Sequence, residues 1–143
     1  MDIWLLLAKA LVSLMAIATA LGGALADLVI PATAKQHMHN PHWPPHARFH
    51  NGQTISLGVF LGLLTLWLLW YSGGDQQLQF HLGVIVAALY WFSMLVASIL
   101  PGTRWVDPAF AKETRAILGM PPQLFLLCVL LALLIGSEIL SFL

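Results

Sequence analysis

The sequence predicts an all-α integral membrane protein in which four transmembrane helices form one bundle. Of its 143 residues, 59% are hydrophobic and only 8% are charged, whereas a soluble domain typically carries about 25% charged residues. The apolar residues fall in four long runs, each near the roughly 20 residues that a helix needs to cross a bilayer. We therefore expect a single four-helix transmembrane domain, residues 1–143, with a histidine-rich first loop and a short interfacial helix between the third and fourth membrane helices.

The first membrane helix is expected from about Ile3 to Ile30. Pro31 ends it, because proline lacks the N–H that the next helical hydrogen bond needs. An alternative is that this run is a cleaved signal peptide, since the small residues at 24–26 resemble a signal-peptidase site. We favour a retained helix, because the run is long, is preceded by no positive charge and is interrupted by Lys9.

The second helix is expected from about Thr54 to Tyr71, where a Ser-Gly-Gly turn follows. It contains Gly58 and Gly62 in G-x-x-x-G spacing, which permits a neighbouring helix backbone to approach closely. We interpret this spacing as a packing feature. The third helix is expected from about Leu78 to Leu100, and the fourth from the Pro-Pro pair at 121–122 to the end of the chain.

The segment between the third and fourth helices also has helical features. Asp107 is a good helix cap, and Pro108 suits the first turn. From Phe110 to Leu118, charged residues alternate with apolar ones. This pattern predicts a short helix that lies on the membrane surface.

The distribution of basic residues predicts the orientation. The second loop and both tails hold no lysine or arginine, and cytoplasmic loops usually carry the excess of these residues. The basic residues of the first and third loops are Lys35, Arg48, Arg104, Lys112 and Arg115. These loops should therefore face the cytoplasm and both termini the opposite side. The zero net charge and the lack of a basic cluster argue against nucleic acid as a partner. The partners we expect are the lipid bilayer and a lipophilic small molecule.

Five of the six histidines lie within fourteen residues of the first loop. Imidazole binds transition metals and titrates near neutrality, so the loop can bind a divalent zinc, iron or copper ion or relay protons. The candidate metal ligands are His37, His39, His42, His46 and His50. The alternative is that histidine, arginine and tryptophan anchor the loop among lipid headgroups without an ion.

The spacing of these histidines suggests two different ways of binding a metal ion. His37 and His39 converge only on an extended or turned backbone, whereas His46 and His50 are four residues apart and share one helical face. The Pro-Pro pair at 44–45 prevents helix upstream, so the second helix should begin early, near His46. With no cysteine nearby, a metal would need histidine and carboxylate ligands.

Asp27 is the carboxylate best placed to join the loop. It lies about one turn before Pro31, where it can bind a metal, orient a histidine, or pair with Lys35 or Arg104. The candidate catalytic residues, as metal ligands, acid–base groups or anion-binding groups, are His46, His50, Asp27 and Arg48.

Two charged residues lie near the opposite surface of the membrane. Lys9 on the first helix and Glu138 on the fourth are each about two turns inside it. Because an unpaired charge is costly in hydrocarbon, we expect them to form a structural ion pair. His81 begins the third helix on this side and is expected to be a lone interfacial residue.

Aromatic and basic side chains provide candidate substrate-binding residues. Tyr90 and Trp91, near the bundle centre, can line a pocket for a flat lipophilic molecule, with core packing as the alternative. At the loops, Arg104 can hold an anionic group, while Trp43 and Trp105 pack on an apolar part.

The segment 43–50, which reads W-P-P-H-A-R-F-H, followed by P-G-T-R-W-V-D-P at 101–108, resembles a family of small four-span membrane proteins of unknown function. The layout is also similar in outline to four-helix membrane families that isomerise sterols, oxygenate aromatic polyketides or bind sterol-like ligands, which is an analogy of architecture alone.

Two functions fit these features. One is a small membrane enzyme that acts on a lipophilic substrate through a metal or acid–base site at the cytoplasmic interface. The other is a non-catalytic lipid- or sterol-binding module or accessory membrane subunit. A proton or metal conduit fits poorly, because no ionisable residue lies in the bundle centre between the two polar ends.

Overall fold

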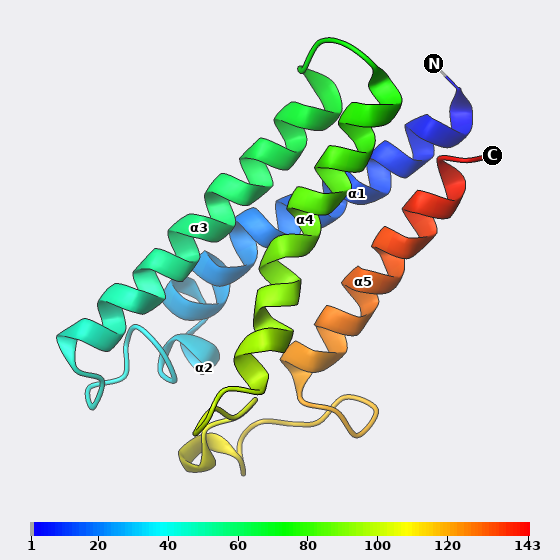
Figure 1. The fold of residues 1–143 in the computed structure, drawn as a ribbon. Coiled ribbons are helices and arrows are strands. Elements are labelled where there is room, and N and C mark those ends of the chain that lie inside the picture. Colours follow the sequence, from blue (N-terminus) through cyan, green and yellow to red (C-terminus); the bar gives the residue numbers. More distant parts are fainter. Residues whose placement is uncertain (1) are drawn as a thin grey trace.

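The computed structural model describes residues 2–143, and four long helices dominate it (Figure 1). Within this range the structure contains no strand, so the chain is all-α as predicted. The elements are α1 (Ile3–Ala24), the π-helix η1 (Leu25–Val29), α2 (Pro31–Ala34), α3 (Pro45–Trp70), α4 (Gln76–Ser98), the 3-10 turn η2 (Pro108–Phe110) and α5 (Pro122–Leu140).

Four helical stretches are long and apolar enough to cross a membrane. They are Ile3–Val29, Pro45–Trp70, Gln76–Ser98 and Pro122–Leu140. The shortest has 19 residues, which at about 1.5 Å per residue spans about 29 Å, close to the roughly 30 Å of the hydrocarbon core. Large apolar side chains are exposed along all four, as is expected of surfaces that face lipid. The chain is a multi-pass membrane protein.

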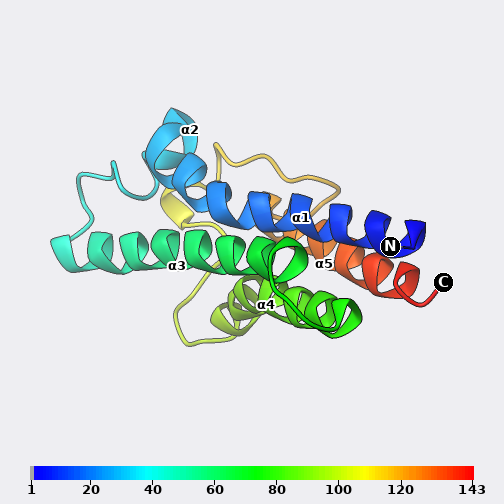
Figure 2. The ribbon, with the colours of Figure 1, turned by 90° about the horizontal axis from the view of Figure 1, so that it is seen from above.

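α1 packs against the other three long helices, most extensively against α3 and then against α5. Figure 2 shows α1 running alongside α3. Their close approach depends on glycine: a Cβ atom at Gly58 would lie 2.9 Å from the carbonyl oxygen of Thr19, and one at Gly62 would lie 2.5 Å from that of Ala16. The interpretation of the G-x-x-x-G spacing as a packing feature is therefore confirmed.

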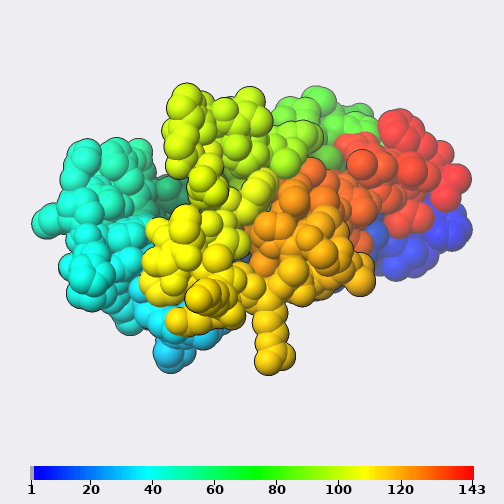
Figure 3. Space-filling model, turned by 90° about the horizontal axis from the view of Figure 1, so that it is seen from below, coloured from blue at the N-terminus to red at the C-terminus, as the bar shows by residue number. Residues whose placement is uncertain are grey.

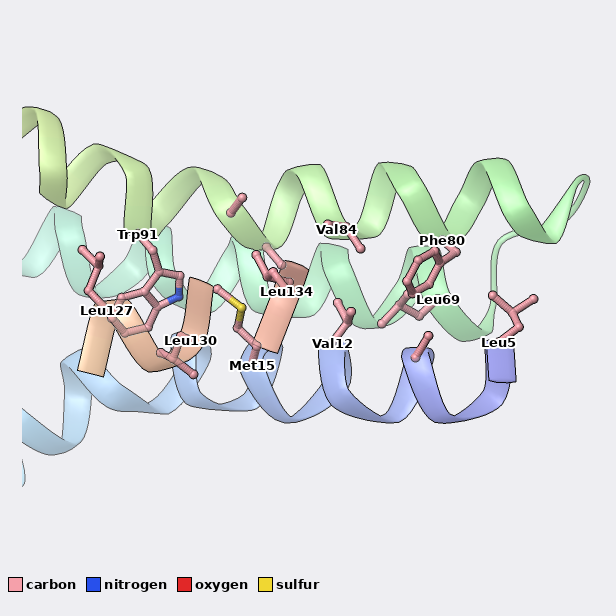
Figure 4. Close-up of a cluster of buried hydrophobic side chains, with 13 residues drawn as sticks. Leu5, Val12, Met15, Leu69, Phe80, Val84, Trp91, Leu127, Leu130 and Leu134 are labelled. Atoms are coloured by element: carbon pink, nitrogen blue, oxygen red, sulfur yellow. The ribbon is translucent and has the colours of Figure 1, made fainter. Parts of the chain in front are cut away.

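The hydrophobic core lies between the four long helices (Figure 4). Met15 of α1 and Phe80 of α4 are fully buried in it, and Leu69 of α3 and Leu127 of α5 are 2% exposed. Trp91 of α4 joins the same cluster toward the end of the bundle that carries the long loops.

The helix boundaries agree with the predictions, with one exception. α3 begins at Pro45, so its early start near His46 is confirmed. The predicted surface helix from Phe110 to Leu118 is wrong: only the single turn η2 forms, with the Asp107 carboxylate accepting a hydrogen bond of 2.8 Å from the backbone N–H of Ala109.

The segment ends in a chain reversal and has no buried face. Leu118 and Gly119 have positive φ angles of 49° and 78° and reverse the chain, so that Ile117 pairs with Met120. The segment is mostly exposed, and without a buried face so short a helix does not offset the cost of its first turn.

The first loop (residues 30–44) and the third loop (residues 99–121) lie at the same end of the bundle, which we call the loop end. Both termini and the α3–α4 turn lie at the other end (Figure 1). Lys35 and Glu113 form an ion pair that joins the two loops. Figure 3 shows the first loop, in cyan and light blue, beside the third loop, in yellow.

Candidate functional site

The candidate site begins at η1, the five-residue π-helix that continues α1. π-helical turns are rare and often occur at functional sites. Asp27 lies in this turn, and its side chain is only 14% exposed. The hydroxyl of Thr33 donates to the carbonyl oxygen of Ala26, which ties α2 back onto η1 and brings the first loop over Asp27.

Both carboxylate oxygens of Asp27 have partners. Oδ1 lies 3.0 Å from Nδ1 of His37, and Oδ2 accepts a hydrogen bond of 2.7 Å from Nδ2 of Asn51 on α3. Nδ1 of His37 is also 3.2 Å from the carbonyl oxygen of Thr33. Because both neighbours of Nδ1 are acceptors, we assign the proton to Nδ1. Nε2 is then the nitrogen of His37 that can accept or donate a proton elsewhere.

The electrostatics of His37 follow from this pairing. The hydrogen bond from the imidazole to Asp27 raises the pKa of His37 above its usual value, and partial burial opposes the shift. The protonated ring is therefore favoured by the carboxylate beside it. Trp43 packs against the same imidazole edge-on, with ring centroids 5.7 Å apart.

His37 lies between two cavities. The inner cavity, of about 220 Å³, is lined by residues of α1, η1, α4 and α5 together with His37. The outer cavity, of about 360 Å³, lies between the first and third loops. His37 and Gln123, at the start of α5, line both cavities. A molecule that occupied both would pass the imidazole.

The inner cavity has an apolar wall with few free polar groups. Tyr90 and Trp91 both line it, beside Thr19 and Asp27. The indole N–H of Trp91 donates to Oγ1 of Thr19 at 2.9 Å, and that hydroxyl donates to the carbonyl oxygen of Met15. The indole of Trp91 and the hydroxyl of Thr19 are thus hydrogen-bonded within the bundle, while Asp27 and His37 form the polar end of the cavity.

The outer cavity has a polar wall. It is lined by Trp43 of the first loop and by Arg104, Trp105 and Asp107 of the third loop. The structure therefore brings together the three loop residues that the sequence suggested for substrate binding, and places Tyr90 and Trp91 in the adjoining cavity.

Arg48 holds the first loop in place. Its Nη2 donates to the carbonyl oxygen of Asn40 at 2.8 Å, and the side chain of Asn40 in turn accepts a hydrogen bond of 3.0 Å from the backbone N–H of His42. Asn40 is buried. The guanidinium of Arg48 is thus bound to the loop backbone.

The five loop histidines do not share one centre. His37 is with Asp27, while His46 and His50 face each other on α3, with their Nε2 atoms 3.0 Å apart. His39 and His42 are exposed. Across residues 2–143, no group of three or more histidine, cysteine or acidic side chains is arranged to hold a metal ion. Asp27 therefore acts on His37 and forms no common cluster with the α3 histidines.

Lys9 and Glu138, at the end of the bundle that carries both termini, do not have the partners that the sequence predicted. Glu138 of α5 lies 2.9 Å from Nδ1 of His81 on α4, so His81 is not a lone residue. Lys9 is 4% exposed, and its Nζ lies 5.6 Å from the centroid of the Trp70 ring. The predicted Lys9–Glu138 pair is wrong for the described part of the chain: Lys9 faces α3 and its aromatic ring, while Glu138 faces α4.

Two polar residues of the site were missed from the sequence. Asn51 binds Asp27, and Gln123 lines both cavities. Gln123 precedes the long apolar run of α5, which extends from Leu124 to Gly136, and this contrast was the available signal. Asn51 gave no comparable signal, because it follows directly on the histidine-rich segment.

Comparison with known proteins assigns the chain to a family. A family model described as a family of unknown function, DUF6640, matches residues 11–134. The chain belongs to this family. The DUF6640 match extends from the middle of α1 into α5 and so includes Asp27, His37, Asn51 and Gln123, and it confirms the resemblance predicted from the sequence. No curated protein and no solved structure matches the chain.

Proposed function

We propose that the chain is a small membrane enzyme that acts on an amphipathic, lipid-like substrate at the loop end of the bundle. His37 is the general acid or base, and Asp27 orients it. One observation carries the proposal: a histidine whose Nδ1 is held by a partly buried carboxylate lies where an apolar cavity meets a polar one. Sites of this kind combine ligand binding with a positioned proton carrier.

The chemistry of this pair is well suited to proton transfer. Asp27 fixes the tautomer of His37, leaves Nε2 free, and stabilises the imidazolium that forms when Nε2 accepts a proton. The same contact raises the pKa of His37, which strengthens it as a base near neutral pH. Asn51 binds the other oxygen of Asp27 and so holds the carboxylate in position.

The two cavities suggest the class of substrate. An apolar portion fits the inner cavity against Tyr90 and Trp91. A polar head fits the outer cavity, where Arg104 offers donors to an anionic or carbonyl oxygen and Trp105 offers an aromatic face. The reacting group would lie between them, at Nε2 of His37.

The proposed orientation places this site on the cytoplasmic side. All six lysines and arginines except Lys9 lie in the first and third loops or at the start of α3. The excess of these residues in cytoplasmic loops supports the assignment.

The experiment compares membrane lipids from a host that produces the parent chain or one of three variants, by mass spectrometry of total extracts. His37→Gln removes the proton carrier, Asp27→Asn removes its orienting charge, and His39→Gln is the matched control, because His39 is exposed and lies in the same loop. We expect the parent and His39→Gln to change the amount of at least one lipid class. His37→Gln and Asp27→Asn should leave it at the level of the empty host.

The second candidate is a non-catalytic lipid-binding module. The mostly apolar wall of the inner cavity, where the Trp91 indole is already bonded to Thr19, favours it. In that case the parent and His37→Gln would both retain the same lipid through detergent purification, and neither would change the lipid extract. That pair of results would exclude the enzyme and support the module.

A further inference from the structure

A second histidine pair lies outside the His37 site, on the first turns of α3. His46 and His50 are four residues apart and project from the same helical face. Their Nε2 atoms are 3.0 Å apart, and the two rings meet at 77° with centroids 4.5 Å apart. Both residues are exposed. Two imidazole nitrogens therefore lie side by side where solvent can reach them.

Gln53 determines which ring nitrogen of His50 carries the proton. Nδ1 of His50 lies 3.3 Å from Oε1 of Gln53, which can only accept. His50 thus carries its proton on Nδ1 and presents a lone pair at Nε2. Nε2–H of His46 then donates to it. A histidine whose second nitrogen is bound by an acceptor is the usual arrangement of a metal ligand, because that bond fixes the tautomer and the ring.

We propose that His46 and His50 form an open, two-histidine site for a divalent late first-row metal ion, with Cu²⁺ as the preferred ion. With metal–nitrogen distances of about 2.0 to 2.1 Å, the 3.0 Å separation corresponds to an N–metal–N angle of about 91 to 97°. This angle matches the near right angles of tetragonal Cu²⁺ better than a tetrahedral zinc site. Cu²⁺ also binds nitrogen ligands most tightly among these ions.

Binding requires a proton shift on His46 and a turn of the two rings away from the line that joins their Nε2 atoms. His46 moves its proton from Nε2 to Nδ1 through water, so that both Nε2 atoms face the ion and no net proton is released. Only two protein ligands are present, since the described part of the chain brings no third histidine, cysteine or carboxylate to the site. Water completes the coordination. The site is separate from the Asp27–His37 pair and does not depend on the proposed enzyme function.

The test uses the full chain, purified in detergent through a cleavable tag that contains no histidine. Cu²⁺ is added, the free ion is removed, and the bound ion is counted by elemental mass spectrometry and examined by electron paramagnetic resonance. We expect one Cu²⁺ per chain, with a spectrum split by two nitrogen ligands. His46→Gln and His50→Gln should each lose this ion, whereas His39→Gln and His42→Gln should keep it.

A further variant guards against a folding defect. Gln53→Ala leaves both ligands in place and removes only the bond to Nδ1 of His50, so it should weaken Cu²⁺ binding by about ten- to a hundred-fold. The proposal is overturned if the parent binds no Cu²⁺, if His46→Gln binds it as the parent does, or if His39→Gln loses it equally. An unchanged affinity in Gln53→Ala would overturn the role given to that residue.

Discussion

Replacing Gly62 by alanine should weaken the bundle where α1 and α3 are closest. The new Cβ atom would lie 2.5 Å from the carbonyl oxygen of Ala16 and 2.8 Å from Cβ of Ala20. A carbon–oxygen contact needs about 3.3 Å, so the helices must separate by up to about 0.8 Å. A gap of this size removes about a quarter to a half of the dispersion energy of each affected contact.

The expected cost is about 1 to 3 kcal/mol, the range for an extra methyl group in a well-packed core. Alanine also stabilises a helix by up to about 1 kcal/mol relative to glycine, which would hide part of this cost. Gly136→Ala is therefore the matched control: Gly136 lies inside α5, and a Cβ atom there meets nothing within 4 Å. The difference between the two variants isolates the cost of the close contact.

The assay is reversible unfolding in mixed micelles, followed by tryptophan fluorescence. Gly62→Ala should unfold at lower denaturant than Gly136→Ala, by an amount equal to about 1 to 3 kcal/mol. Equal stability of the two variants would refute the account, because it would mean that the α1–α3 approach does not depend on the missing side chain.

Two further predictions concern charged side chains at opposite ends of the bundle. Asp27→Asn should lower the pKa of His37, measured by NMR of labelled histidine, because the substitution removes the carboxylate that raises this pKa. The parent should also lose stability as pH rises through the raised pKa of His37 in the folded state, and the variant should lose less. An unchanged pKa would contradict the assignment of the pair. Trp70→Leu should destabilise the protein by about 1 to 2 kcal/mol through loss of the ring beside Lys9. Ser13→Ala, which removes only the hydrogen bond from the Trp70 indole, should cost less in the same unfolding assay, and the reverse order would argue against the cation–π contact.

The four membrane helices could be predicted because their signals are local. Length, hydropathy and proline positions place the ends of α3 and α5 within a few residues of the structure. The surface helix failed for a related reason: Asp107 and Pro108 do start a turn, but the residues that follow are mostly exposed and have no buried face to stabilise further turns. Local start signals say little about how far a helix extends.

The pairing of polar residues was harder to predict, because it depends on the rotation of each helix. Lys9 and Glu138 lie on α1 and α5 as expected, yet the faces they occupy turn them toward Trp70 and His81. Asp27 was recognised as a residue able to orient a histidine. That His37 is its partner follows from η1 and α2, and these have no clear signature in the sequence.

The π-helix η1 also separates two structural tasks within one continuous span. A π turn closes its hydrogen bond one residue later than an α turn, so it acts as a one-residue insertion in the helix. Each residue of an α-helix turns by about 100°. The side chains beyond η1 are therefore rotated about the helix axis, by up to that angle, from the directions they would have if α1 continued without the π turn. Asp27 lies within this shift, so the face that it presents to His37 and to Asn51 of α3 is not fixed by the phase of the Gly58–Gly62 seam alone.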